Sequence, residues 1–393
     1  MHSNYIKKIF GFKDVLIRNI NSKEDSLEFT MELPVTEQIC PCCGAKTKYI
    51  KDYYKQQVRD IPFNFKPTTI FFKKPRYVCN ECGKTFYPQN EVVRKYKRTT
   101  TRLTEYVINE LHKMVSISTI SKNVNVSPNF ISRTLPYLSI TNTKLPEVLC
   151  IDEFKGNSGN NKYQVILLDG ITHEIIDILD SRYKHSLCDY FKRFPQEELN
   201  NVKYLVTDLW KTYKDIGMTY FRKAKIVADR FHWSRYATEA MDKIRKETQS
   251  KLTTTEKRKF KKSRKLLLSR KKNLRPESLE RLDFLLFNFS ENLRIAYREK
   301  EEILDIIHST ESPEIKKLQF SEWVKRNLES NISQLQECAK TFFHWSYEIK
   351  NSLEVPFSNG PTEGKNNKIK TLKRITFGMP NFKNFKARIL LSN

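Results

Sequence analysis

The segment EVLCIDEF, residues 147–154, decides the fold of the central part of this chain. It is a short apolar run typical of a buried strand, and it delivers an acid, Asp152. VKYLVTDLW at 202–210 repeats the pattern with Asp208, and a third apolar run ends in Asp229. The sequence thus predicts three apolar strands that each deliver an acid at the end.

The segments between these acids predict the rest of the sheet. Apolar alternation predicts two further strands, KYQVILLDGI at 162–171 and HEIIDILD at 173–180. The spacing of HSLCDYFKRF at 185–194 predicts a helix. Three antiparallel-type strands followed by helix, strand, helix and strand indicate an α/β core of the RNase H-like kind.

A carboxylate at the end of a buried strand is expensive unless it is paired or bound to a metal. Asp152 and Asp208 could share Mg²⁺, which prefers carboxylate oxygen and keeps several of its waters. Two metal ions held in this way support in-line phosphoryl transfer. Alternatively, each aspartate caps the turn or helix that follows it, and the residues alone leave both readings open.

The charge balance points to a polyanionic partner. The 393 residues include 71 Lys+Arg and 45 Asp+Glu, a formal net charge of +26. Basic residues cluster at 94–102, at 256–275 and from Gly364 to the end, where no acid occurs. Such blocks are expected for phosphate contacts. A solvated surface in a Lys-rich protein is the alternative, but it does not explain three separated blocks of one sign.

Composition also excludes several classes. Hydrophobic residues make up 39% of the chain, which argues against a wholly disordered protein. The longest apolar runs are far shorter than the roughly 20 residues of a membrane-spanning helix. The N-terminal sequence has no secretory pattern, so we expect a cytoplasmic, nucleoid-associated protein. The length suggests two to four domains.

Two cysteine knuckles predict a structural zinc site. CPCCG at 40–44 and CNECG at 79–83 each contain C-x-x-C-G. The two-residue spacer lets both sulfurs reach one tetrahedral metal, and the glycine permits the turn beneath it. The expected ligands are Cys40, Cys43, Cys79 and Cys82. A hairpin or short sheet must fill the gap between the knuckles. Cys42 is expected to be a spare thiol outside the site. A disulfide pair is the less favoured alternative.

A helix-turn-helix is expected after the first basic block. Leu103, Val107 and Leu111 follow helical spacing, and a second helix is predicted at 117–124 with Asn125 as its left-handed cap. Ser127 then caps a third helix, and Pro128 occupies its first position. An ordinary three-helix bundle is the alternative.

The other three cysteines, Cys150, Cys188 and Cys338, are predicted to be core residues.

The segment SNGPTEGKNNKIK, at 358–370, predicts a turn followed by a basic helix. Glu363 lies in the first turn of that helix, and Asn367, Lys370 and Arg374 follow along the same face. A carboxylate at the head of a basic helix can hold a metal while the helix grips a phosphate backbone. The alternative is a glutamate that only stabilises its own helix N-terminus.

Together these segments resemble the ISL-three family of insertion-sequence transposases, over most of the chain. CPCCG…CNECGKTF, IDEF, TDLW, VADRFH and SNGPTEGKNNKIK…GMPNFKNFKARIL carry the resemblance. It implies an RNase H-like fold with a DDE triad, which falls on Asp152, Asp208 and Glu363. Asp229 and His232 match a further motif near the active site, and we assign them a supporting role.

The spacing of the triad predicts a helical insertion. Glu363 follows Asp208 by 155 residues, and the intervening sequence is typical of long helices, among them LERLDFLLFNFSENLRIAY and FSEWVKRNLESNISQLQECAKTFFHW. Their aromatic residues Trp323, Phe342, Phe343 and Trp345 are expected in the core. The predicted domains are a zinc ribbon at 1–93, a helix-turn-helix at 94–143, a catalytic core at 144–240 and 351–393, and the insertion at 241–350.

The resulting hypothesis is a DNA transposase that binds terminal inverted repeats and performs Mg²⁺- or Mn²⁺-dependent cleavage and 3′-OH strand transfer. It is expected to act as a dimer or higher oligomer on DNA. The alternatives are a non-catalytic DNA-binding regulator and a nuclease without strand transfer. The predicted DNA contacts are Arg94, Lys95, Lys97, Arg98, Arg102, Asn129, Ser132, Arg133, Lys257, Arg258, Lys259, Lys261, Lys262, Arg264, Lys265, Asn367, Lys370 and Arg374.

Overall fold

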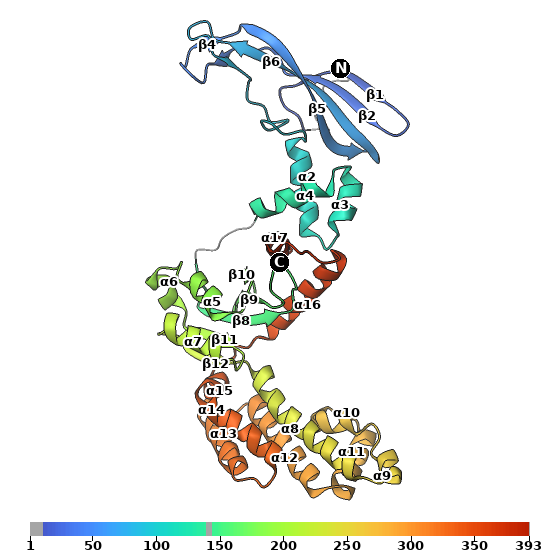
Figure 1. The fold of residues 1–393 in the computed structure, drawn as a ribbon, viewed down its shortest axis with the longest axis vertical. Coiled ribbons are helices and arrows are strands. Elements are labelled where there is room, and N and C mark those ends of the chain that lie inside the picture. Colours follow the sequence, from blue (N-terminus) through green and yellow to red (C-terminus); the bar gives the residue numbers. More distant parts are fainter. Residues whose placement is uncertain (1–10, 139–143, 393) are drawn as a thin grey trace. The chain divides into compact units, whose positions relative to one another are not determined.

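The structure is a computed structural model that describes residues 11–138 and 144–392 (Figure 1). Its contacts divide the chain into two compact units. Unit 1 comprises Met1–Ser139, Leu372–Met379 and Lys383–Asn393, and unit 2 comprises Ile140–Thr371 and Pro380–Phe382. Unit 1 is therefore built from both ends of the chain. In the described residues, no helix is long and apolar enough to cross a bilayer.

A mostly antiparallel sheet forms the first half of unit 1. Its strands are β1 (Leu16–Ser22), β2 (Leu27–Glu32), β5 (Ile50–Phe63), β6 (Lys66–Val78) and β7 (Thr85–Phe86), in the order β1-β2-β6-β5 with β7 beside β6. The long β5–β6 hairpin confirms the expected filling of the gap between the cysteine knuckles (Figure 1). Asn64 and Phe65 turn it, both with positive φ, as tight two-residue hairpin turns require.

Three short helices follow as predicted: α2 (Thr101–His112), α3 (Ile117–Val124) and α4 (Pro128–Thr134). Asn125 ends α3 in the left-handed conformation, at φ 51° and ψ 45°. The Ser127 hydroxyl accepts a hydrogen bond from the backbone N–H of Phe130 and so caps α4. A 3-10 turn, η1 (Leu135–Leu138), closes this group. The C-terminal helix α17 (Phe382–Leu391) adds Ala387 to the same hydrophobic core.

Unit 2 contains a second five-stranded sheet in the order β10-β9-β8-β11-β12. The strands are β8 (Val148–Phe154), β9 (Gln164–Asp169), β10 (Ile175–Leu179), β11 (Tyr204–Thr207) and β12 (Lys225–Ala228). The first three strands pair antiparallel, whereas β8, β11 and β12 run parallel. Helices α5 (Lys184–Phe191), α6 (Gln196–Asn201) and α7 (Lys211–Tyr220) connect them. The number of strands, their order along the chain and the antiparallel pairing of the first three agree with the prediction, whereas the parallel pairs and α6 were not predicted.

The register of the parallel strands brings the acids together. Val206 of β11 pairs with Cys150 of β8. Asp208 and Asp152 each follow two residues later, so they lie opposite one another. We expected Asp152 to end its strand, but β8 continues to Phe154 in its pairing with β9. It lies instead just beyond the last residue of β8 that pairs with β11.

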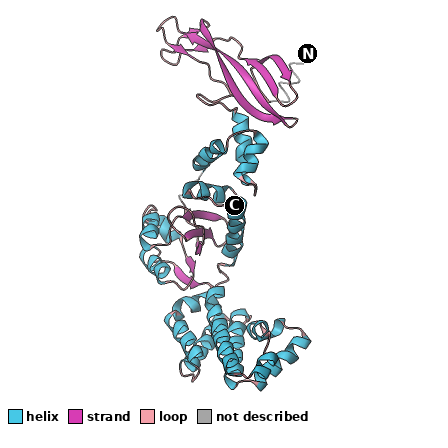
Figure 2. Cartoon of the chain, turned by 45° about the vertical axis from the view of Figure 1, so that its right-hand side comes forward, coloured by secondary structure: helices cyan, strands magenta, loops and turns pink. Residues whose placement is uncertain are grey.

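Helices make up the rest of unit 2 (Figure 2). They are α8 (Arg230–Lys251), α9 (Thr254–Lys259), α10 (Ser263–Leu268), α11 (Pro276–Asn288), α12 (Glu291–His308), α13 (Pro313–Leu328), α14 (Ser333–His344), α15 (Ser346–Glu354) and the first part of α16 (Gly360–Ile375), with the 3-10 turn η2 (Lys271–Asn273). Trp233, Trp323 and Phe342 are fully buried at the centre of the bundle formed by α8 and α10–α15.

Several details of this bundle differ from the prediction. The two long helical segments each break at a serine-containing turn, after Asn288 and after Leu328. In the second turn the Ser330 hydroxyl accepts a hydrogen bond from the Ile332 backbone N–H, in competition with the helix. Phe343 is 65% exposed, so its assignment to the core was wrong, although Trp323, Phe342 and Trp345 are buried. Cys150 and Cys338 are buried as predicted, whereas Cys188 is only partly buried.

Candidate active site and metal centres

Asp152 and Asp208 form the centre of the candidate active site. Asp152 is only 8% exposed, and its Oδ1 accepts a hydrogen bond of 2.7 Å from the Glu153 backbone N–H. Asp208 follows β11 directly, and its Oδ1 is buried without a hydrogen-bond partner among the described residues. Ligand atoms of Asp152, Asp208 and His232 lie within 4.8 Å of one another. This group has the donor chemistry and the separation needed to hold a metal ion.

Asp229 and His232 stand at the start of α8. Asp229 is buried and caps the helix by accepting a hydrogen bond from the His232 backbone N–H, the role that we considered as the simpler alternative for a strand-end aspartate. Its other oxygen accepts from the Asn359 backbone N–H at 2.9 Å. The cap orients His232, whose Nε2 lies 3.4 Å from Asp208 Oδ1. Asp229 is thus a structural support, whereas His232 belongs to the ligand group itself.

The electrostatics of the site favour a bound cation. Burial, and then the negative charge of Asp208, raise the pKa of Asp152 to about 7. Burial, and then the charges of Asp229 and Glu153, raise the pKa of Asp208 to about 7 as well. Both shifts describe carboxylates that lack sufficient positive charge nearby. A divalent cation between them would supply that charge.

Helix α16 brings a residue to the site that the sequence did not single out. The Asn366 side-chain amide is buried and donates a hydrogen bond of 2.9 Å to Asp152 Oδ2. Asn367, which we had selected as a DNA contact, faces solvent instead. The adjacent residues Asn366 and Asn367 were the only sign in the sequence of such a contact. Which of the two faces inward depends on which face of α16 packs against the site.

Glu363 lies in the first turn of α16, as predicted, and its side chain is exposed. It is outside the group formed by Asp152, Asp208 and His232 in the described residues. Asn366 follows Glu363 by three residues, about one helical turn, on a neighbouring part of the helix surface. The structure therefore brings two members of the predicted triad together and places the third on α16, the helix whose Asn366 contacts Asp152.

The start of α16 carries further polar groups toward the interior. The Asn359 side-chain amide donates to the Ile151 carbonyl oxygen at 3.1 Å. Three buried oxygens have no hydrogen-bond partner among the described residues: Asn359 Oδ1, Thr362 Oγ1 and Asn366 Oδ1. Buried polar atoms are rarely left in this state, so these oxygens indicate bound water or a ligand at this edge.

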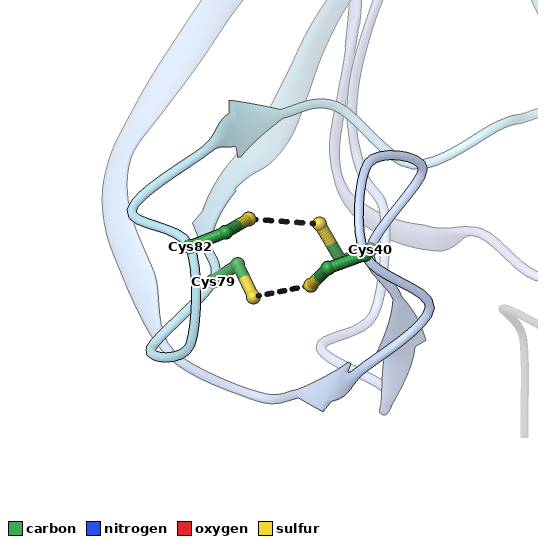
Figure 3. A group of neighbouring side chains, drawn as sticks. Cys40, Cys79 and Cys82 are labelled. Carbon is green, nitrogen blue, oxygen red and sulfur yellow. Dashed lines mark hydrogen bonds between the residues drawn. The ribbon is translucent and has the colours of Figure 1, made fainter.

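The four predicted cysteines form a compact cluster in unit 1 (Figure 3). Cys40 Sγ lies 3.6 Å from Cys82 Sγ, and Cys43 Sγ lies 3.5 Å from Cys79 Sγ. A zinc ion with Zn–S bonds of about 2.3 Å requires sulfurs about 3.8 Å apart, whereas a disulfide would need about 2.05 Å. Gly44 and Gly83 have the expected positive φ. The four sulfurs are thus placed to hold one zinc, and Cys42 stays exposed.

The first basic block, residues 94–102, which we call the basic arm, and the helix-turn-helix line one groove of about 980 Å³ in unit 1. Lys97 and Arg98 of the arm line it, and so do three residues of α4 that the sequence selected, Asn129, Ser132 and Arg133. Arg94 and Lys95 are exposed nearby in the sequence. Arg102 is different, because its guanidinium forms an ion pair with the buried carboxylate of Asp60 and so holds the domain together.

The remaining predicted DNA contacts face solvent in unit 2 and along α16. The seven residues chosen from the basic block at 256–275 are all exposed: Lys257, Arg258, Lys259, Lys261, Lys262, Arg264 and Lys265. The last four of them line a groove of about 890 Å³ together with Arg281. On α16, Asn367, Lys370 and Arg374 are also exposed.

Comparison with known proteins agrees with this arrangement. Residues 149–389 match a family model described as a transposase, residues 36–82 match the zinc finger of the transposases IS204/IS1001/IS1096/IS1165, and residues 88–134 match the helix-turn-helix domain of transposase family ISL3. The transposase for insertion sequence element IS1001 of Bordetella parapertussis is 23% identical over 385 residues, covering 95% of this chain and 94% of that protein. An ATP-dependent protease of Lactococcus lactis subsp. lactis is 46% identical over 56 residues, 14% of this chain and 18% of that protein.

Proposed function

Because this chain belongs to the ISL3 family of transposases, we propose that it cuts the ends of an insertion sequence and joins them to target DNA. The observation that carries the proposal is the convergence of Asp152 and Asp208 at adjacent strand ends, with His232 and Asn366 against them. The family and its two DNA-binding domains imply that the chain binds DNA. The chemistry, the triad and the ends that it recognises are our proposal.

We propose that the second sheet and its helices form an RNase H-like core with a DDE triad. Asp152 and Asp208 hold Mg²⁺ or Mn²⁺, and Glu363 completes the site by turning its exposed carboxylate toward them. The raised pKa values of the two aspartates and the unpartnered Asp208 Oδ1 support a cation there. When bound, the metal activates the attacking oxygen and stabilises the leaving oxygen of phosphoryl transfer.

The two reactions share one chemistry. In cleavage, water attacks a phosphorus at the end of the element, and the bond to the 3′ oxygen breaks to leave a 3′-OH. In joining, that hydroxyl attacks a target phosphodiester, so that one P–O bond forms as another breaks. Asp152 and Asp208 position the reacting groups, Asn366 fixes the Asp152 carboxylate, and Asp229 orients His232 through its cap on α8.

The other parts of the chain recognise DNA. We propose a zinc ribbon at 1–93 and a helix-turn-helix at 94–143 that bind terminal inverted repeats, and a catalytic core at 144–240 and 351–393 interrupted by a helical insertion at 241–350. The exposed basic block of that insertion contacts the DNA backbone. Two ends must be cut and joined together, so the active form is a dimer or a higher oligomer on DNA.

A joining assay tests this proposal. The protein is incubated with a labelled, pre-cut terminal repeat, a plasmid target and Mg²⁺, and joined products are measured. The wild-type chain should join the end. Asp208→Asn should abolish joining while end binding persists, because the change removes a metal ligand but no DNA contact. Joining at an undiminished rate by Asp208→Asn would refute the assignment of the site.

A further inference from the structure

The C-terminal helix α17 is part of the core of the helix-turn-helix. Ala387 is fully buried there, in one cluster with Leu103, Val107 and Leu111 of α2, Ile120 and Val124 of α3, Val126, Ile131 of α4 and Leu135. Met379 and Leu391 pack against the same cluster. A helix from the C-terminal segment, which the sequence had assigned to the catalytic core, thus supplies part of the interior on which α4 rests.

Arg388 ties α17 to the connection between α2 and α3. Its Nη2 donates hydrogen bonds of 2.7 Å to the carbonyl oxygens of Lys113 and Val115. These carbonyls lie at and just beyond the C-terminal end of α2, where arginine is a favourable partner. The Arg388 side chain is fully buried, and burial lowers its pKa to about 10. Nε and Nη1 of Arg388 are buried without a hydrogen-bond partner among the described residues, so Nη2 alone makes the tie to the α2–α3 connection.

The same helix also borders the groove beside α4. Asn384 of α17 lines this groove together with Asn129, Ser132 and Arg133. The groove therefore has walls from three parts of the sequence, namely the basic arm, α4 and α17. Amide and guanidinium groups of this kind recognise base edges and phosphates in DNA.

We propose that α17 is a fourth helix of the DNA-binding domain, which completes its core and contributes Asn384 to the groove that receives terminal-repeat DNA. This inference rests on the proposed DNA-binding function. It adds Asn384 to the DNA interface and makes DNA binding depend on α17. The helix-turn-helix becomes competent to bind only in a chain that carries its own C-terminus. The residues of α4 touch DNA, but α17 fixes how α4 is presented.

Full-length variants test the packing role of α17. Ala387→Glu places a carboxylate at a fully buried position and should displace the helix. Lys383→Glu is the matched control, because it adds the same side chain at an exposed position of the same helix. The ratio of affinities for a duplex with the terminal sequence flanking this gene and for a scrambled duplex of equal length is then measured by fluorescence anisotropy.

The expected result is a loss of about tenfold or more in this ratio for Ala387→Glu, since a displaced α4 no longer reads bases. Lys383→Glu should weaken both affinities through its charge and leave their ratio near the wild-type value. All four tryptophans of the chain, Trp210, Trp233, Trp323 and Trp345, lie in unit 2. An unchanged tryptophan unfolding midpoint in Ala387→Glu therefore shows that the loss arises in unit 1. An unchanged affinity ratio overturns the inference.

Asn384→Ala tests the groove role of Asn384, whose side chain is partly buried on α17. This variant should lower the same ratio roughly fivefold or more, as expected for loss of one base contact, with unchanged zinc content. A ratio equal to that of the wild type would overturn the assignment of Asn384. The proposed function fails separately, if the wild-type chain itself does not prefer the terminal sequence over the scrambled duplex.

Discussion

The side-chain amide of Asn366 donates a hydrogen bond of 2.9 Å to Asp152 Oδ2, and this contact joins residues 214 positions apart. It fixes the rotation of a carboxylate whose other oxygen is held by the Glu153 backbone. A ligand oriented by such partners binds metal in one geometry. Asn366 is therefore a positioning residue for the proposed catalytic metal site.

Asn366→Ala should slow strand joining by roughly 10- to 100-fold and raise the Mn²⁺ concentration that gives half-maximal joining. End binding should persist, because the amide faces the interior. Asn367→Ala is the matched control, since its neighbouring side chain is exposed, and it should leave the Mn²⁺ dependence unchanged. An unaltered Mn²⁺ dependence in Asn366→Ala would show that the contact serves only packing.

Cys79→Ser should release the zinc and weaken binding to the terminal repeat, because three thiolates no longer complete a tetrahedral site. Metal analysis of the purified chain measures the zinc, and anisotropy measures the binding. Cys42→Ser is the control, because Cys42 is exposed and lies outside the cluster. Full zinc occupancy in Cys79→Ser would contradict the ligand assignment.

If the basic groove of unit 2 binds DNA, its cations should contribute to the salt dependence of the affinity for DNA. The logarithm of the affinity should fall by about 0.9 per tenfold change in salt for each phosphate neutralised. Replacing Lys261, Lys262, Arg264 and Lys265 with glutamine should therefore flatten the slope by about 0.9 for each cation that contacts DNA. Lys203→Gln is the control, because its ammonium already pairs with Glu147 at 3.1 Å. Identical slopes for the fourfold variant and the wild type would remove the groove from the DNA interface.

Glu299 should make the helical bundle sensitive to acid. Burial raises its pKa, but hydrogen bonds from Asn327, Arg326 and Arg298 outweigh burial and hold the pKa below its usual value. A lowered pKa in the folded state means that the stabilisation is present above the unfolded-state pKa and is lost as the pH falls through the folded-state pKa.

Glu299→Gln should therefore lower the free energy of unfolding by roughly 1–3 kcal/mol at neutral pH and by less in acid. Tryptophan fluorescence during urea unfolding measures the difference, because Trp323 Nε1 donates to the Glu299 carbonyl oxygen. Glu302→Gln, which affects a more exposed carboxylate, should change stability little. A pH-independent difference between wild type and Glu299→Gln would contradict this account.

Local chemistry made much of this fold predictable. Ser127 and Pro128 start α4 because a hydroxyl cap and a fixed φ favour that position, whatever packs around them. The sequence suggested that Asp152 and Asp208 could share a metal ion, and the parallel pairing of β8 with β11 brings them together. The cysteine knuckles likewise carry their own geometry in their spacing.

Features that depend on distant partners were not predictable. The choice between Asn366 and Asn367 depends on which face of α16 packs against the sheet. Arg102 belongs to a basic run, yet a buried aspartate 42 residues earlier captures it. Phe343 sits beside two buried aromatic residues in the sequence, but α14 turns it to solvent. The partnership of α17 with the helix-turn-helix has no local signal at all.

The return of the chain to unit 1 has a genetic consequence. A gene copy interrupted by a stop codon before Phe382 encodes a chain without Ala387 and Arg388, and so without a complete core for the helix-turn-helix. If α17 completes the DNA-binding domain as we propose, such fragments should fail to bind the ends of the element and should not block them. Decaying copies of the gene would therefore not repress an intact one, and each full-length chain would keep its access to the DNA that encodes it.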